Sequence, residues 1–271
     1  MSLLLCRLEP VRHPFEVPEL GIRLYSSQEL CYVIYENPLL VMEDFVDERL
    51  LQFIREDLDM DFLAGKLENW KKSGENPDNI LLLILAECSY YMSGEINRYR
   101  QTLIQLRKKH PAEFGKIRAD YLFEKRQYGK VIPLYEKLLE YPKDNIVNDL
   151  FYSRVWSCLG ACHARMFQAE KAYRAYEKAY FYDNRNEKIL EQIYYLKAMF
   201  PSVAIAPRIQ SMLKLIRRES WNTSIERARK KGEESVAVKE LDKLFFKDEE
   251  KRLEGAAKLV QQWKQEYRAM M

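Results

Sequence analysis

Glycine is scarce in this sequence, with nine residues among 271, and no two glycines lie closer together than Gly65 and Gly74. Dinucleotide-binding fingerprints and phosphate-binding P-loops both need several glycines within a few residues, because the backbone must approach a phosphate closely. Neither motif can be written anywhere in this chain. The spacing therefore excludes nucleotide binding by those two routes.

Histidine is scarcer still, with only His13, His110 and His163. These offer few candidates for a general base, and no serine or cysteine stands in a recognisable nucleophile motif. The sequence therefore predicts a protein that is not an enzyme, has no catalytic residues and uses no cofactor.

The five cysteines are an odd number, and none belongs to a C-x-x-C pair, which favours reduced thiols over a disulfide framework. Cys158, Cys162 and His163 fall about one helical turn apart and could be metal ligands, but a zinc site needs about four. Cysteine is among the most frequently buried residue types. We therefore interpret these three residues as part of the core and expect no metal.

Long hydrophobic runs are also missing. The opening Leu3–Cys6 meets Arg7 too early to form the apolar region of a signal peptide, and no later run approaches the roughly 18 apolar residues of a membrane span. We expect a soluble cytoplasmic protein with no membrane span.

Apolar residues recur at intervals of three and four along most of the chain, which predicts an all-α fold. The exception is residues 1–26, where 3–8 and 21–25 flank a proline-containing stretch and could pair as a β-hairpin or form an extended arm. Residues 27–77 are predicted to be a helical cap. We expect Ser26 or Ser27 to start its first helix, Asp44 or Asp47 to start the next, and Gly74 to end the last.

A specific pattern lies between residues 156 and 179. It consists of Trp156, Leu159, Gly160, Ala172, Tyr176 and Ala179. This spacing closely resembles the tetratricopeptide repeat, a helix hairpin of about 34 residues, although His163 and Asn184 stand where the family has tyrosine and proline. In such a hairpin Gly160 must be small, so that the second helix can approach the first.

Weaker neighbouring hairpins extend the resemblance over roughly residues 78–200. One runs through Ala119 and Val131–Leu139, and an earlier one includes 80–91, predicted as its first helix. A single repeat cannot bury both of its faces, so a helix-hairpin solenoid is expected. About seven extra residues near 145–151 should lengthen a helix or a connection.

In the family, the first helix of each hairpin lines a concave groove that receives a peptide or a helix. The resemblance implies these groove positions: Tyr91, Lys116, Asp120, Arg154, Ser157, Ala161, Arg165 and Tyr195. The lysine and asparagine clamp that some members use for acidic tails is not reproduced here. The alternative is that these polar side chains are only solvated.

Residues 201–271 are predicted to be a carboxy-terminal helical cap that does not repeat the pattern. One apolar stripe includes Ile209, Trp221 and Ile225, and a second runs from Leu253 to Tyr267. These stripes either close the end of the solenoid or form a binding face for a partner helix.

Charge is uneven: residues 43–61 carry eight acidic and two basic side chains, whereas 203–231 carry eight basic and two acidic. Such runs are usually solvated. The basic segment 208–231 could instead contact phosphates, or the acidic segment of a second chain. Its candidate residues are Arg208, Lys214, Arg217, Arg218, Arg227, Arg229, Lys230 and Lys231.

The sequence thus predicts a non-catalytic interaction scaffold or adaptor that binds a protein or peptide partner in the solenoid groove. The alternative is a regulator whose basic carboxy-terminal helices contact nucleic acid, which the near-balanced total charge of +3 does not favour. Either a monomer or a homodimer is compatible with these patterns.

Overall fold

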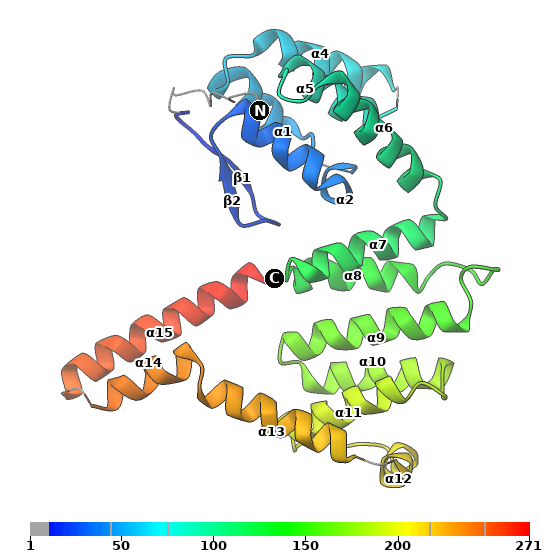
Figure 1. Ribbon diagram of the computed structural model, residues 1–271, viewed down its shortest axis with the longest axis vertical. Coiled ribbons are helices and arrows are strands. Elements are labelled where there is room, and N and C mark those ends of the chain that lie inside the picture. Colours follow the sequence, from blue (N-terminus) through cyan, green and yellow to red (C-terminus); the bar gives the residue numbers. More distant parts are fainter. Residues whose placement is uncertain (1–10, 44, 75, 217, 247) are drawn as a thin grey trace. The chain divides into compact units, whose positions relative to one another are not determined.

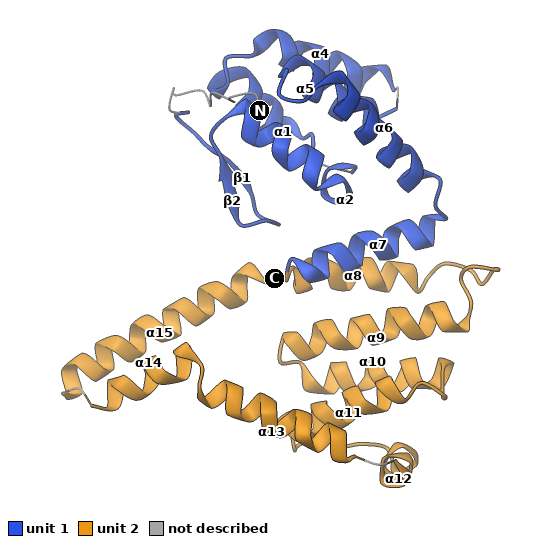
Figure 2. Ribbon diagram, in the orientation of Figure 1, with its two compact units in different colours: residues 1–125 blue, residues 126–271 orange. Residues whose placement is uncertain are grey.

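The computed structural model describes residues 11–43, 45–74, 76–216, 218–246 and 248–271. These residues form fifteen α-helices, one π-helical turn and one two-stranded sheet, which confirms the all-α prediction (Figure 1). The chain divides into two compact units, residues 1–125 and residues 126–271 (Figure 2). This division lies inside the predicted repeat span 78–200 and does not coincide with any predicted domain boundary. The boundaries predicted after residues 26, 77 and 200 remain predictions.

The first unit begins with an antiparallel β-hairpin. Strand β1 (Phe15–Val17) pairs with β2 (Ile22–Leu24), with Phe15 opposite Leu24. Gly21 has a φ of +65° in the turn, a conformation that glycine adopts without steric cost. A β-hairpin is therefore present within residues 1–26, and it joins β1 to β2. The predicted strand 3–8 lies outside the described residues.

Seven α-helices and one π-helical turn complete the first unit. They are α1 (Ser27–Glu36), α2 (Pro38–Val41), α3 (Glu48–Gln52), the π-helical turn η1 (Phe53–Asp57), α4 (Asp61–Ser73), α5 (Asp78–Glu87), α6 (Ser93–Arg107) and α7 (Pro111–Glu124).

Capping side chains start two of these helices. The Ser26 hydroxyl accepts from the Glu29 amide at 3.2 Å, and the Asp47 carboxylate accepts from the Leu50 amide at 2.9 Å. Each bond satisfies an amide that has no partner inside its helix. Gly74, with a φ of +70°, ends α4. Of the alternatives, Ser26 and Asp47 are thus the caps, and Gly74 ends its helix as predicted.

Arg107 ties three elements of the first unit together. Its guanidinium lies 2.8 Å from Asp78 Oδ1 on α5, 2.8 Å from the carbonyl oxygen of Met42 and 3.3 Å from Glu43. Asp78 is buried, so the guanidinium compensates the negative charge of a carboxylate that has little access to water. The hydrogen bonds to Asp78 raise the pKa of Arg107.

Eight helices are described in the second unit. They are α8 (Tyr128–Leu138), α9 (Asp149–Arg165), α10 (Ala169–Tyr182), α11 (Glu187–Met199), α12 (Pro207–Leu215), α13 (Glu219–Glu233), α14 (Val236–Phe245) and α15 (Glu249–Ala269).

Helices α8 to α11 pack successively, each against the next, as the stack in Figure 1 shows. The extra residues expected near 145–151 lengthen the connection between α8 and α9, where the Asp144 carboxylate accepts from the amides of Ile146 and Val147. Helix α11 ends at Met199, one residue before the predicted repeat span ends at residue 200. Both α12 and α13 then pack on α11.

Helices α14 and α15 form a hairpin after α13. The last residues of the chain lie against the start of α8, within the same unit. The Gly129 amide donates to the Met270 carbonyl at 2.7 Å, and the Gln127 side-chain amide donates to the Ala269 carbonyl at 3.3 Å. These bonds satisfy carbonyls at the end of α15 that have no partner inside that helix.

Candidate protein-binding surface

The pattern residues of 156–179 form the contact between α9 and α10. A Cβ atom added to Gly160 would lie 2.7 Å from the ring of Tyr176, and Ala172 and Ala179 are fully buried. Only a residue without a side chain allows this approach, because protein interiors are close-packed. Burial raises the pKa of the Tyr176 phenol. This close contact explains why the sequence requires glycine there.

All three histidines have structural partners. His163 is buried, and its Nδ1 lies 2.8 Å from the side-chain oxygen of Gln168; burial lowers the pKa of its imidazole. His110 accepts from the Ala112 amide at the start of α7, and the amide of His13 donates to the Asp57 carboxylate.

In the described parts of the chain, no three histidine, cysteine, aspartate or glutamate side chains gather so that they could hold an ion. Cys162 is buried and Cys158 is half-buried on α9. Nor does the described structure contain a helix that is long and apolar enough to cross a membrane.

Four of the predicted groove residues share one face of α9. Arg154, Ser157, Ala161 and Arg165 follow one another at intervals of three and four, which places them on a single side of the helix. Arg154 and Arg165 are exposed, and the two smaller residues between them are half-buried. The buried Val155, Leu159 and Cys162 point to other sides of the helix, so the polar face is separate from the core.

Three of the predicted groove residues lie in the first unit. Lys116 and Asp120 on α7 form an ion pair with each other at 2.6 Å. Tyr91 was predicted to lie in the first helix of a hairpin, but α5 ends at Glu87 and Tyr91 lies in the connection to α6. There its ring stacks on Tyr35 with the centroids 4.2 Å apart. The predicted helix 80–91 is therefore too long at its end, because Tyr90 and Tyr91 continue the apolar pattern of α5 beyond its last residue.

The remaining predicted groove residue, Tyr195, lines an apolar cavity of about 510 Å³ between α11 and α13. The cavity wall from α11 is Tyr195, Ala198 and Met199, and the wall from α13 is Ser224, Ile225, Ala228 and Arg229. The Tyr195 hydroxyl donates to Glu191 at 2.6 Å, and this hydrogen bond raises the pKa of the phenol. We call this cavity the α11–α13 groove.

Packing between Trp221 and Tyr194 holds α13 on α11. Trp221 is buried with its ring centroid 5.6 Å from that of Tyr194, whose hydroxyl donates to Asn222 at 2.6 Å. The Arg218 guanidinium lies 5.7 Å from the centroid of the Tyr194 ring, within the range of a cation–π contact. These contacts fix both walls of the α11–α13 groove.

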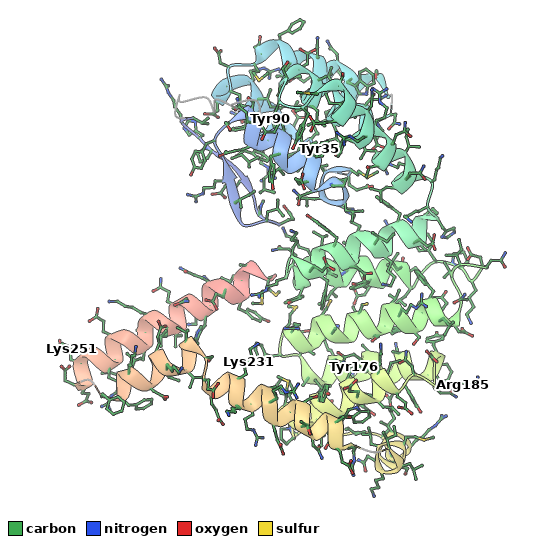
Figure 3. All side chains as sticks on the ribbon, in the orientation of Figure 1. Tyr35, Tyr90, Tyr176, Arg185, Lys231 and Lys251 are labelled. Carbon is green, nitrogen blue, oxygen red and sulfur yellow. The ribbon has the colours of Figure 1, made fainter. Side chains whose placement is uncertain are left out.

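The predicted basic residues lie on two helices. Arg208 and Lys214 lie on α12, Arg218 is the residue before α13, and Arg227, Arg229, Lys230 and Lys231 are exposed on α13. Arg217 lies outside the described residues. Lys231 lies near the end of α13 (Figure 3). The apolar stripe predicted from Ile209 to Ile225 is also interrupted, because Ile216 has an extended backbone between the two helices.

The groove joins two sets of residues that the sequence analysis kept apart. It brings Tyr195, a predicted groove position, beside Arg229, a predicted basic residue. Sequence reasoning missed Ala198, Met199 and Ala228, although Ile225 and Ala228 are three residues apart on one helix face. The signal lay in that spacing, but the helix that α13 faces could not be inferred from it.

The sequence matches no protein-family model, no curated protein and no solved structure.

Proposed function

We propose that this chain is a non-catalytic interaction scaffold, built as a tetratricopeptide-like solenoid, that binds a helical segment of a partner protein in the α11–α13 groove. One observation carries the proposal, which is the apolar cavity between two adjacent helices, with Arg229 among its lining residues. The exposed arginines of α9 would offer a second set of contacts on the same unit.

The shape of the groove favours a helix as the bound segment. Ala198 and Ala228 are small residues, one on each wall, and Tyr195, Met199 and Ile225 are larger. A helix with apolar residues at intervals of three and four can insert its side chains between such walls. A carboxylate on the bound helix would pair with Arg229, which is the cation among the lining residues.

The first experiment selects ligands from a displayed library of random peptides of about 18 residues, long enough to form a helix. We expect the selected peptides to share apolar residues at intervals of three and four together with an aspartate or glutamate. Calorimetric titration should then show binding at least about tenfold weaker to an Ala228→Phe variant, because the ring fills the groove.

The matched control is Lys231→Ala, on the same helix but not among the lining residues, which should bind the selected peptides as the wild type does. A second variant, Arg229→Gln, should weaken acidic peptides more than their Asp→Asn or Glu→Gln counterparts. Peptides that bind Ala228→Phe as tightly as the wild type would refute the groove as the binding site.

The exposed cations Arg227, Lys230 and Lys231 favour one alternative, a contact with nucleic acid. Phosphate contacts would make binding to a labelled single-stranded oligonucleotide fall steeply with salt, and a triple Arg227→Gln, Lys230→Gln and Lys231→Gln variant would remove it. Peptide binding in an apolar groove should instead change little over the same salt range. The two readouts separate the proposals in one set of variants.

A further inference from the structure

Helices α14 and α15 form a hairpin that buries very little of its apolar surface. Leu244 is the one buried side chain that the structure describes in either helix, and it packs against Gly255, where an added Cβ would lie 2.5 Å from a Leu244 methyl group. Phe246, at the end of α14, is 90% exposed. Isolated helices gain little from propensity alone and depend on packing of an apolar face. The hairpin therefore lacks most of the core that a helix pair needs.

Five apolar residues of α15 follow a heptad spacing. Leu253, Val260 and Tyr267 are seven residues apart, and Ala256 and Trp263 occupy the intermediate positions. Leu253 is 66% exposed, Val260 and Trp263 are each 43% exposed and Tyr267 is 38% exposed. Apolar residues at this 3.5-residue average spacing form the contact line of helices that pack along each other. We call these five residues the α15 seam.

We propose that the α15 seam is a dimer interface that packs against the same seam of a second copy of this chain, with the two α15 helices antiparallel. Together with their α14 helices the two copies would form a four-helix bundle. Such an interface is isologous, because each copy contributes the same surface.

The available area is sufficient for a stable dimer. The exposed apolar side chains of the hairpin include Val236, Val238, Phe245, Phe246 and the larger seam residues. Together they expose on the order of 10³ Å² per copy, compared with about 800 Å² that each partner contributes to a standard interface. Scattered single apolar residues are common on protein surfaces, but large exposed apolar areas mark interaction sites.

Side-chain size favours the antiparallel arrangement. With a two-fold axis between residues 261 and 262, Tyr267 of one copy lies opposite Ala256 of the other, and Val260 lies opposite Trp263. Large residues then meet small or medium ones, so that the layers fill evenly. A parallel pairing in register would set Trp263 against Trp263 and Ala256 against Ala256, which crowds one layer and leaves a void in the next.

Charge favours a second copy over an anionic partner. Helix α15 carries five basic and four acidic residues, and Lys258 forms an ion pair with Glu254 inside the helix at 2.6 Å. The five seam positions carry no charge. In the antiparallel pairing the flanking Lys264 lies beside Ala257 and Glu266 beside Leu259, so like charges do not meet. A lipid surface would instead select an excess of lysine and arginine on the polar face.

Sedimentation velocity of the full chain tests this interface. We expect a species of twice the monomer mass of 32.4 kDa, and a Val260→Glu, Trp263→Glu double variant should be monomeric, with dimer affinity reduced at least about 100-fold. The matched control, Gln261→Glu with Gln265→Glu, adds the same charge at exposed positions outside the seam and should remain dimeric. An unchanged circular dichroism spectrum verifies that the variants fold.

Cross-linking tests the direction of the helices. A mixture of tagged Ala256→Cys and untagged Tyr267→Cys chains should form a disulfide between the two variants under mild oxidation, above the background of the wild-type chain with its native cysteines. Efficient cross-linking of Ala256→Cys with itself would overturn the antiparallel arrangement. A wild-type chain that stays monomeric at about 100 μM would overturn the interface, as would dimerisation that persists in the Val260→Glu, Trp263→Glu variant.

Discussion

Two helix hairpins of the second unit, α9 with α10 and α14 with α15, differ sharply in how they are packed. The first buries Gly160, Ala172, Tyr176 and Ala179 along its contact and continues into α8 on one side and α11 on the other. The second buries Leu244 and is otherwise almost entirely exposed. Hairpins of similar secondary structure can therefore contribute very differently to stability, according to whether neighbouring elements cover their outer faces.

The largest difference in stability is expected between the Tyr176→Ala variant and the Trp263→Ala variant. We expect Tyr176→Ala to lower the free energy of unfolding by about 3–5 kcal/mol, because it removes a buried ring and leaves a cavity. Trp263→Ala should change it by no more than about 0.5 kcal/mol, because that ring is partly exposed. Urea denaturation of dilute protein, below the concentration at which it self-associates, measures both. Equal losses would refute the contrast.

A smaller loss is expected from Gly160→Ala. The added methyl group would lie 2.7 Å from the Tyr176 ring, so the ring or the helix must move. Overpacking of this kind costs about 1–3 kcal/mol. Thermal unfolding should show the loss. In a Gly160→Ala, Tyr176→Leu double variant the smaller side chain leaves room for the added methyl group, so the combined loss should be less than the sum of the two single losses. An unaffected single variant would mean that the contact is looser than the structure shows.

A pH effect is expected within the α9–α10 hairpin. Because burial lowers the pKa of His163 in the folded chain, the unfolded chain binds a proton at that residue more readily. The stabilisation is fully present above the ordinary histidine pKa of about 6.5 and is lost as the pH falls through the lower, folded value. From about pH 8 to about pH 5, the wild type should therefore lose more stability than His163→Gln. Parallel pH profiles of the two proteins would contradict this assignment.

The smallest effect is expected from Lys178, whose ammonium group lies 4.2 Å from the centroid of a Trp156 ring. Replacing Lys178 by glutamine should cost about 0.5–1 kcal/mol, the usual size of an exposed cation–π contact. Arginine at the same position should restore most of the loss. If alanine, glutamine and arginine all give the same stability, the contact contributes nothing.

Local signals in the sequence predicted more of this structure than long-range packing did. Ser26, Asp47 and Gly74 act through bonds and backbone angles within a few residues, so their roles could be read directly. The need for a small residue at Gly160 could be predicted because α10, the helix that approaches it, follows α9 directly in the sequence. The strand that pairs with β2 and the exact end of α5 depended on packing that no local residue encodes.

The candidate site shows the same limit. The face of α9 that carries Arg154 and Arg165 follows from helical spacing alone. The α11–α13 groove does not, because Tyr195 and Arg229 are separated by a loop, by α12 and by a second break near Ile216. Helix α13 lies beside Tyr195 because Trp221 packs on Tyr194. No pattern in the sequence predicts that contact.

The π-helical turn η1 accommodates one extra residue at the end of α3. The Leu58 amide bonds to the Phe53 carbonyl five residues earlier, at 3.0 Å, instead of the usual four. Phe53, Ile54 and Leu58 are all buried. Because the wider turn takes up one residue more than an α-helical turn, deleting one residue here would leave a regular helix with Leu58 in almost the same direction. Deleting one residue from the regular part of α4 would instead rotate the rest of that helix by about 100°.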